Sequence, residues 1–513
     1  MLLLSLIHSL RGDAEQAIAF AQEGVALGER LNSPFVTAVA QMRLGHALQL
    51  APAPTPGPSP ARGGGVGEGA YNTAIALGDR LAVRRTRAEA MWGLTRAYGY
   101  RGDLASAQRA AAEGVEICHW AGDPWVEALI QLALGASHVL AGRAADSAPI
   151  LSGALALFRN CGDAHGRAAT RLWLALAYRE LRQTEHLASS LETLLELCET
   201  NGYDSLLTAP TLAGVPDPRR IVPLLLEARS SRIRPAYATR LLARLGLADV
   251  QVHPGYQLRV WTLGGFQVWR GEVEVTGREW QRDKARQLFQ LFITERGRWL
   301  QRDEITERLW PDLSPESAVR DFKVALNALN RAIEPARATD AAFAYVVRDG
   351  SAYRLRPEAD LWLDAAAFRQ QCEEGLRLAA GERAEQAIGH LQEGLRLYRG
   401  DYLPDALYED WASLERDRLL TLYLRAAERL ASLTIERGQH DEGLKLCEAI
   451  LARDACWEQA YRLLMIAHTR QGNRPQAFRA YQRCVETLRA ELDVAPSSET
   501  ASLYWRVAGE MEV

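Results

Sequence analysis

The feature that most constrains this chain is a repeating punctuation by glycine in its first 205 residues. Gly12, Gly102 and Gly142 each separate two apolar helical stretches. Twenty residues after each glycine comes a second break, which recurs at Gly122, Gly162 and Gly202 and sets a period of 40 residues. Glycine suits the left-handed residue that closes a helix, and the Asp or Ser that often follows suits the N-cap of the next helix. A period of this length built from helix pairs predicts an α-solenoid.

Small residues at matching places in the repeats let antiparallel helices approach closely: Ala17, Ala21, Ala107 and Ala111. The array resembles the MalT-like tetratricopeptide repeats of large bacterial regulators, and we assign it to residues 1–205. A stretch rich in proline and glycine, residues ~51–69, predicts a disordered insertion, for which a tolerated loop is favoured over a PxxP-type ligand. Residues 206–253 predict a helical connector.

Length, composition and net charge exclude some classes of protein. A chain of 513 residues is too long for one hydrophobic core, and 48% hydrophobic with 24% charged residues is typical of globular proteins. A formal net charge of -4 argues against a nucleic-acid coat protein or a membrane-surface protein. It leaves room for one local DNA-binding module, since residues 256–356 hold 17 Lys and Arg against 14 Asp and Glu.

The sequence predicts neither an enzyme nor a bound cofactor or metal. Its seven cysteines lie singly, without metal-ligand spacing, which favours a reducing cytoplasm. No apolar run is long enough to predict a membrane span, and no nucleophile motif surrounds the scattered histidines. The phosphate-binding pattern GxxxxGK[ST] is absent, although large regulators with such repeats usually carry an ATPase module. We therefore expect the chain to be a fragment, a shortened gene product or one part of a split system.

Residues 254–357 predict a small α+β domain. Alternation of apolar and polar residues begins at Tyr256, and glycine turns break the following segments into short antiparallel strands. Helical patterns follow at 285–293 and 303–310. Ser314 and Pro315 then suit the N-cap and first residue of a third helix over 314–334.

The third helix has two chemically different faces at 100° per residue. The apolar residues Phe322, Ala325, Leu326, Leu329 and Ile333 share the side that must pack inward. The opposite side and its flank carry basic and amide residues, which can bind guanine and adenine edges in a major groove: Arg320, Lys323, Asn327, Asn330 and Arg331. This helix is therefore the predicted DNA-reading element.

A basic hairpin over 345–355, with an Asp349-Gly350 type I′ turn, follows the third helix. From it Arg348, Arg354 and Arg356 are expected to contact phosphates or a minor groove. Strands, three helices and a hairpin in this order predict a winged helix-turn-helix. The motif around Trp280, Lys284-Ala285-Arg286, Leu309-Trp310-Pro311 and 318–331 resembles the OmpR-type winged helix of the SARP activators. That resemblance implies DNA contacts from Arg320, Lys323, Asn327 and Arg331.

Residues 358–513 predict a second helical block. Gly438, Gly443 and Cys447 recur 34 residues later as Gly472, Ala477 and Tyr481, which is the tetratricopeptide period. The segments 397–404, 408–419 and 492–500 resemble the bacterial transcriptional activator domain that follows the winged helix in SARP-type proteins. Four aromatic residues of this block are expected in its core: Tyr398, Tyr402, Tyr408 and Trp411.

The predicted fold is mainly α, with two TPR-like solenoid blocks flanking the small winged-helix domain. The predicted function is a transcription regulator, and an activator, that binds double-stranded DNA. Its partners are expected to include RNA polymerase, a protein or peptide effector on the N-terminal repeats, and further copies of the chain. The alternative is a TPR scaffold or adaptor whose winged helix docks protein instead of DNA.

Overall fold

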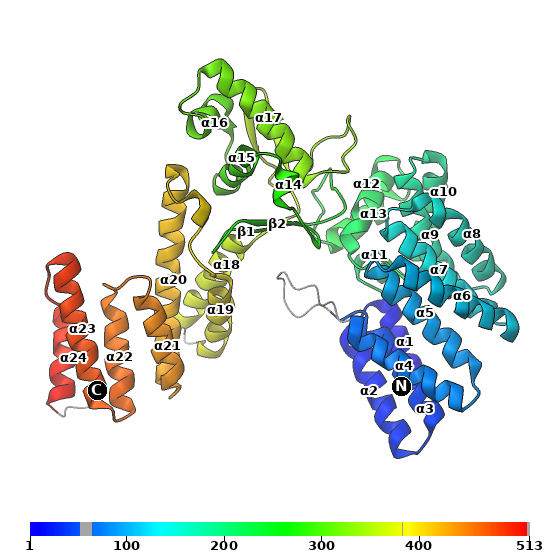
Figure 1. The fold of residues 1–513 in the computed structure, drawn as a ribbon, viewed down its shortest axis with the longest axis horizontal. Helices are drawn as coiled ribbons and strands as arrows, with labels where there is room; N and C mark the ends of the chain where they lie inside the picture. The colour runs from blue at the N-terminus through cyan, green and yellow to red at the C-terminus, as the bar shows by residue number, and fades with distance from the viewer. Residues whose placement is uncertain (52–63, 382, 510–513) are drawn as a thin grey trace. The chain divides into compact units, whose positions relative to one another are not determined.

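The computed structural model describes residues 1–51, 64–381 and 383–509 (Figure 1). The chain divides into two compact units, Met1–Tyr256 (unit 1) and Gln257–Val513 (unit 2). Both units are mainly helical, as the sequence predicts, and strands occur in unit 2. No helix within the described residues has both the length and the apolar character that crossing a membrane requires.

Unit 1 is built from antiparallel helix pairs stacked side by side (Figure 1). Each helix packs against the next along the chain, and the odd-numbered helices also pack against one another in series. The helices of the array are α1 (Leu2–Arg11), α2 (Ala14–Arg30), α3 (Pro34–Leu48), α4 (Gly64–Arg80), α5 (Arg84–Tyr100), α6 (Leu104–Ala121), α7 (Pro124–Leu140), α8 (Ala144–Asn160), α9 (Ala164–Glu180) and α10 (Thr184–Asn201).

The predicted glycine breaks do end helices in the left-handed conformation. Gly12 (φ 82°), Gly122 (φ 66°) and Gly202 (φ 71°) close α1, α6 and α10. Carboxylates after the breaks then cap the next helices, as when Asp103 accepts the N–H of Ser106 at 3.0 Å. The small residues predicted at the helix contacts are fully buried. Residues at the breaks themselves therefore determine where the helices of the array begin and end.

The predicted insertion at ~51–69 falls in part outside the described residues, because residues 52–63 are not described. For residues 64–69 the prediction is wrong, since α4 already begins at Gly64. Close packing accounts for one glycine of this stretch, Gly67. A Cβ at Gly67 would lie 3.3 Å from the carbonyl oxygen of Gly45 on α3, so this part of α4 approaches its neighbour closely.

The predicted connector is an integral part of unit 1. It contains α11 (Asp204–Thr208), the 3-10 helix η1 (Pro218–Ile221), α12 (Val222–Ser230) and α13 (Pro235–Arg244). Leu212, Leu225, Leu241 and other apolar residues of this segment belong to one buried cluster with residues of α5 to α10. The segment therefore completes the core of the repeats.

Unit 2 begins with a four-stranded sheet in the order β3-β2-β1-β7. Strands β1 (Leu258–Trp261), β2 (Gln267–Arg270) and β3 (Val273–Glu274) pair antiparallel as predicted. Strand β7 (Leu361–Leu363) pairs parallel with β1, so the sheet extends beyond residue 357, where we expected the module to end. A three-residue strand next to a helix gives no periodicity, which is why the sequence did not predict β7.

Helices and a hairpin follow the first three strands in the predicted order. They are α14 (Gly277–Trp280), α15 (Asp283–Thr294), α16 (Arg302–Leu309), α17 (Pro315–Ile333) and the strands β5 (Val346–Asp349) and β6 (Ala352–Leu355). A short strand, β4 (Leu300–Gln301), joins the hairpin in a three-stranded sheet. We refer to residues 257–363 as the strand–helix module.

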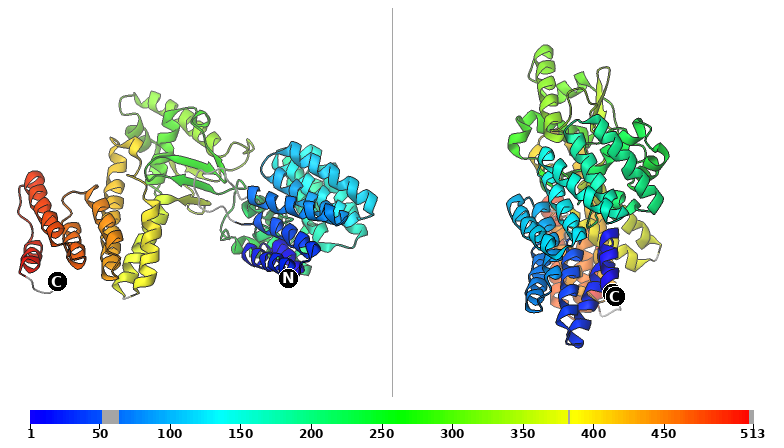
Figure 2. Two further views of the ribbon diagram at one scale, coloured as in Figure 1. Left: turned by 60° about the horizontal axis from the view of Figure 1, so that its bottom comes forward. Right: turned by 90° about the vertical axis from the view of Figure 1, so that its right-hand side faces the viewer.

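The C-terminal helices pack as successive antiparallel pairs (Figure 2). Of the four aromatic residues expected in the core, Tyr398 and Tyr402 are buried, whereas Tyr408 is 95% exposed and Trp411 is half-buried. Tyr408 lies between η2 and α20 and belongs to neither, so helical spacing does not predict which way its side chain points. The elements are α18 (Asp364–Ala380), α19 (Ala384–Leu397), η2 (Pro404–Ala406), α20 (Asp410–Glu436), α21 (His440–Leu451), α22 (Glu458–Arg470), α23 (Arg474–Leu492) and α24 (Ser498–Ala508).

Candidate nucleic-acid interface

Helix α17 is seated in the strand–helix module by one apolar face. The hydroxyl of Ser314 accepts the N–H of Ser317 at 3.4 Å, and Pro315 opens the helix, as predicted. Of the five apolar residues that the spacing places inward, Phe322, Ala325, Leu329 and Ile333 are buried, whereas Leu326 is only half-buried. Phe322 also packs edge-on against Tyr353 of β6, with ring centroids 5.0 Å apart. The hairpin and the helix therefore share one core.

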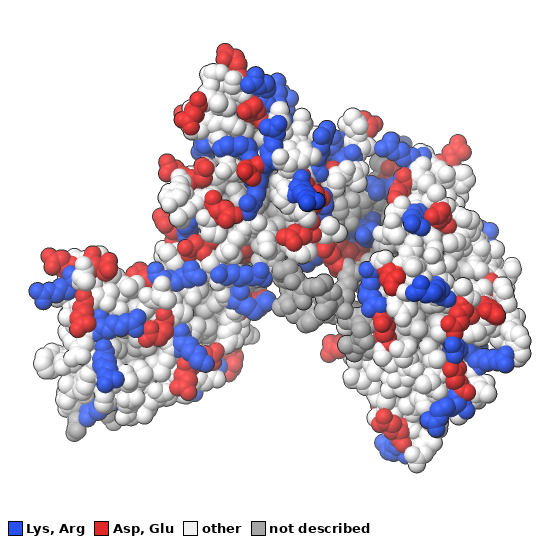
Figure 3. All heavy atoms as spheres, viewed as in Figure 1, with Lys and Arg blue, Asp and Glu red and all other residues white. Residues whose placement is uncertain are grey.

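The opposite face of α17 is exposed and basic. Arg320, Lys323, Asn327 and Arg331 are all exposed, together with Val324. The Arg320 side chain is 73% exposed, with its Nε 3.8 Å from the carboxylate of Asp321. Within the described ranges, no side-chain hydrogen bond or ion pair engages Lys323, Asn327 or Arg331. Figure 3 shows Lys and Arg atoms along α17 at the top of the view, with Asp and Glu atoms among them.

Asn330 does not lie on this exposed face, which corrects the sequence prediction. It is 6% exposed, and its buried Oδ1 atom has no hydrogen-bond partner among the residues that the structure describes. Lys323 and Asn330 share one flank of the helix by spacing, but α14 packs against α17, and Arg270 donates to the carbonyl oxygen of Ala332 at 2.9 Å. Neighbouring elements thus cover the C-terminal end of this flank and leave its N-terminal end open.

The hairpin is attached to the end of α17 by a buried carboxylate. Glu334 is 5% exposed and accepts the N–H groups of Ala344 at 3.0 Å and Tyr345 at 3.2 Å. Burial raises the pKa of Glu334, while the two backbone N–H groups and nearby arginines oppose that rise. The local spacing does not predict this burial, because it contains no sign that a later segment folds back onto Glu334.

The turn of the hairpin differs from the predicted type. Asp349 pairs with Ala352, so the two central residues are Gly350 and Ser351, not Asp349 and Gly350. Gly350 has a φ of 57°, and Ser351 is not among the residues with positive φ. A type I′ turn needs positive φ at both central residues, so the predicted type is wrong. Arg348 is exposed near this turn, and its Nε donates to the carbonyl oxygen of Gly350 at 2.7 Å.

The other two hairpin arginines are less available than the sequence suggested. Arg354 is half-buried, with its guanidinium 4.3 Å from the ring centroid of Trp299. Arg356 has a side chain only 18% exposed, which pairs with Glu358 at 3.1 Å and donates to the carbonyl oxygen of Phe343 at 3.0 Å. Arg356 is therefore engaged within the protein, which corrects its assignment as a DNA contact. The sequence analysis did not include Trp299 among the candidate interface residues, although it is 36% exposed and follows Arg298.

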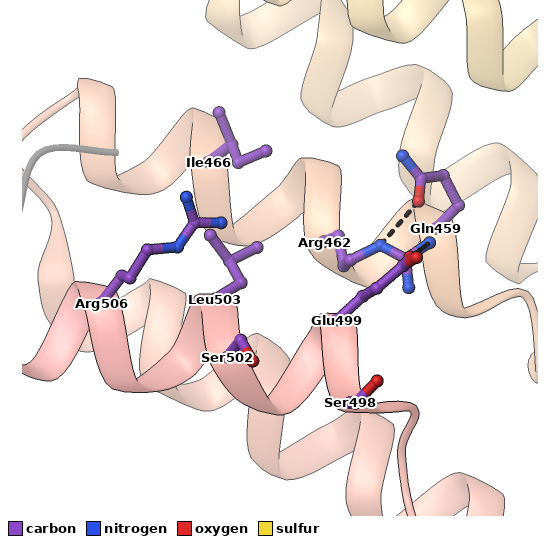
Figure 4. A pocket seen from close by; sticks show the side chains of 8 residues that line it. All are labelled: Gln459, Arg462, Ile466, Ser498, Glu499, Ser502, Leu503 and Arg506. Atoms are coloured by element: carbon purple, nitrogen blue, oxygen red, sulfur yellow. Dashed lines mark hydrogen bonds and ion pairs between the residues drawn. The ribbon is translucent and has the colours of Figure 1, made fainter.

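A hollow formed by residues far from α17 in the sequence lies between α22 and α24 (Figure 4). It has a volume of about 480 Å³, and Arg462 and Arg506 both reach it. Arg462 is already engaged, because its Nε donates to Gln459 at 2.6 Å and its Nη2 lies 3.4 Å from the carboxylate of Glu499. None of the residues that line this hollow belongs to α17, so it is not part of the candidate nucleic-acid interface.

Comparisons with known proteins give one family match and several related regulatory proteins. Residues 363–508 match the family described as Bacterial transcriptional activator domain. The regulatory protein AfsR of Streptomyces coelicolor is 25% identical over 251 residues, which are 49% of this chain and 24% of AfsR. The regulatory protein DnrI of Streptomyces peucetius is 27% identical over 222 residues, which are 43% of this chain and 82% of DnrI.

Among solved structures, EmbR of Mycobacterium tuberculosis in complex with a low-affinity phosphopeptide shows a TM-score of 0.44 at 22% identity. That similarity covers 50% of this chain and 66% of EmbR. The chain thus spans about a quarter of AfsR and just under two thirds of EmbR. The chain is thus similar over about half of its length to bacterial regulatory proteins, and residues 363–508 match the model of the bacterial transcriptional activator domain.

Proposed function

We propose that this chain is a cytoplasmic transcription activator that binds double-stranded DNA through the exposed face of α17 and the β5–β6 hairpin. The observation that carries the proposal is the division of α17 into a buried apolar face and an exposed face with Arg320, Asn327 and Arg331. Arginine binds guanine and asparagine binds adenine through paired hydrogen bonds in the major groove. Lys323 and Arg348 are placed in the proposal as phosphate contacts.

The remaining parts of the chain receive the roles predicted from sequence. Residues 1–205 form the proposed sensing repeats, 206–253 complete them, 254–357 form the proposed winged-helix domain, and 358–513 form the activator domain. The family match over residues 363–508 supports the assignment of the last block, and the similarity of about half of the chain to regulatory proteins supports the overall role. Contacts with RNA polymerase and self-association through the activator domain belong to the same proposal.

The small number of exposed basic groups on α17 and the β5–β6 hairpin sets the expected strength of binding. Among the described residues these two elements carry four exposed cations: Arg320, Lys323, Arg331 and Arg348. If all four neutralised phosphates, log K would fall against log salt with a slope of about -4 for duplex DNA. Contacts to bases instead of phosphates would lower that slope further, so we expect modest affinity that depends weakly on salt.

The direct test measures binding of the full chain to a fluorescent random-sequence duplex by anisotropy at low salt. The double variant Arg320→Ala, Arg331→Ala is expected to bind at least about tenfold more weakly, because binding to random-sequence DNA is mainly electrostatic and this variant removes two of the four proposed cations. The matched control is Arg377→Ala, Arg396→Ala, which removes two arginines from surface ion pairs of α18 and α19. Equal loss in both double variants, or none in the first, would contradict the assignment of α17.

The alternative function is a scaffold whose strand–helix module docks protein. Val324, 37% exposed between the basic residues, favours it, as does the overall acidity of the chain. The same titration separates the two functions. If the folded wild-type chain binds no duplex at low salt, the scaffold function is supported. If the wild-type chain raises the anisotropy of the duplex and only the α17 variant loses this effect, the DNA-binding regulator is supported.

A further inference from the structure

The outward face of the β5–β6 hairpin carries an arginine stacked on a tryptophan. Along β6, Tyr353 points inward onto Phe322 of α17, with ring centroids 5.0 Å apart. Because successive side chains of a strand point to opposite faces, the next residue, Arg354, lies on the outward face. Its guanidinium carbon lies 4.3 Å from the ring centroid of Trp299. The hairpin therefore presents a cation on the side opposite to its contact with α17.

The pairing of β4 with β6 brings Trp299 beside Arg354. Leu300 pairs with Tyr353 in an antiparallel register, so the residue before Leu300 lies next to the residue after Tyr353. Leu300 is 1% exposed, whereas Trp299 is 36% exposed, which is the alternation expected when one face of a sheet is covered. On its other side, Arg354 pairs with the half-buried Val347 of β5. Arg354 therefore lies between an aromatic ring and a branched apolar side chain.

These contacts bury the stem of Arg354 and leave its end accessible. The Nε atom is buried and has no hydrogen-bond partner among the described residues, whereas the two Nη groups are reached by solvent. Within the described part of the chain, no hydrogen bond or ion pair engages those Nη groups. The carboxylate of Glu358 is already paired with Arg356 at 3.1 Å. Arg354 thus keeps donors that an external anion can accept from.

Stacking on an aromatic ring is compatible with binding of an anion by the same guanidinium. The ring attracts the face of the guanidinium, whereas the N–H donors point outward in its plane. Trp299 can therefore hold Arg354 without using the donors that bind a phosphate. A mobile arginine loses side-chain entropy when it binds, and stacking removes part of that entropy in the free protein already. The pair is therefore arranged to bind an anion at a reduced entropic cost.

We propose that Trp299 is a positioning residue for DNA binding, which holds Arg354 so that its Nη groups donate to a phosphate of the duplex backbone. This inference rests on the proposed function and adds a fifth cation to the four exposed cations of α17 and the hairpin. Each phosphate contact adds about 0.9 to the magnitude of the slope of log K against log salt. Loss of the Arg354 contact therefore reduces that magnitude by about 0.9.

The test measures duplex binding of the full chain by fluorescence anisotropy at several salt concentrations. Trp299→Leu keeps an apolar side chain but removes the ring, so we expect about two- to fivefold weaker binding and a shallower salt slope. Trp299→Phe keeps a ring over Arg354 and is expected to retain the wild-type slope. The matched control is Trp505→Leu, because Trp505 is 69% exposed on α24 and should change neither the affinity nor the slope.

A double-mutant cycle with Arg354→Ala separates positioning from packing. Arg354→Ala alone is expected to reduce the magnitude of the salt slope by about 0.9. In that background Trp299→Leu should change neither the affinity nor the slope, because the cation that Trp299 positions is gone. A residue that only packs would weaken binding equally in both backgrounds, since the effects of independent residues add.

Several results would overturn the proposal. They are a wild-type slope in Arg354→Ala, equal weakening by Trp299→Leu and Trp299→Phe, equal weakening by Trp299→Leu with and without Arg354, and an unfolded Trp299→Leu chain, which urea unfolding would reveal and which would make Trp299 a core residue. If the wild-type chain binds no duplex, the proposed function fails as well. If the double variant Arg320→Ala, Arg331→Ala loses binding while the Trp299 variants match wild type, this inference alone fails.

Discussion

Asp364 at the start of α18 joins two parts of unit 2 through buried hydrogen bonds. Its carboxylate is fully buried and accepts the N–H groups of Thr262, Leu263 and Ala365 at 2.7–2.9 Å, and the hydroxyl of Thr262 at 2.7 Å. In Asp364→Ala these buried donors lose their acceptor, at about 1–3 kcal/mol each. Relief of the buried charge offsets part of that loss. We therefore expect the free energy of unfolding of unit 2 to fall by about 3–5 kcal/mol.

The isosteric variant sharpens this prediction. In Asp364→Asn one oxygen becomes an NH2 group facing backbone N–H donors, so asparagine is expected to restore little of the lost stability. The control is Glu373→Ala, an exposed residue of the same helix, which should change stability by less than about 0.5 kcal/mol. Urea unfolding of the full chain gives the magnitudes, and amide hydrogen exchange in β1 and β7 assigns the transition to unit 2. A loss below about 1 kcal/mol in Asp364→Ala, or full stability in Asp364→Asn, would refute the reasoning.

Two further changes test the buried polar groups. Burial lowers the pKa of His46 well below its usual 6.5, so unit 1 is expected to keep full stability above that pH and lose it as pH falls. Urea unfolding between pH 7 and 5 gives the free energy of unfolding as a function of pH. In His46→Gln this free energy should fall less steeply with decreasing pH than in wild type, by up to about 1.4 kcal/mol per pH unit. An unchanged slope would contradict the role given to His46. Glu334→Ala should speed amide hydrogen exchange at Ala344 and Tyr345 and lower the free energy of unfolding by about 2 kcal/mol. The control Glu316→Ala, at an exposed position, should change neither quantity.

The helix boundaries and the two faces of α17 follow from sequence because they depend on neighbours within a few residues. Glycine at Gly122 and Gly202, and a capping Asp at Asp103, end and begin helices through their own backbone and side-chain geometry. A spacing of three and four residues likewise places Phe322 and Arg331 on opposite sides of any helix over 315–333. These features need no knowledge of the rest of the fold.

Only the tertiary structure decided which polar residues stay free. Asn330 and Lys323 share a flank by spacing, yet packing near the C-terminal end of α17 buries only Asn330. The pairing of β7 with β1 joins residues about a hundred apart, and the hydrogen bonds from the Arg96 guanidinium to the carbonyl oxygens of Thr211 and Leu212 span a similar separation. Local spacing states which side of an element a residue occupies, whereas burial depends on what the rest of the chain brings to that side.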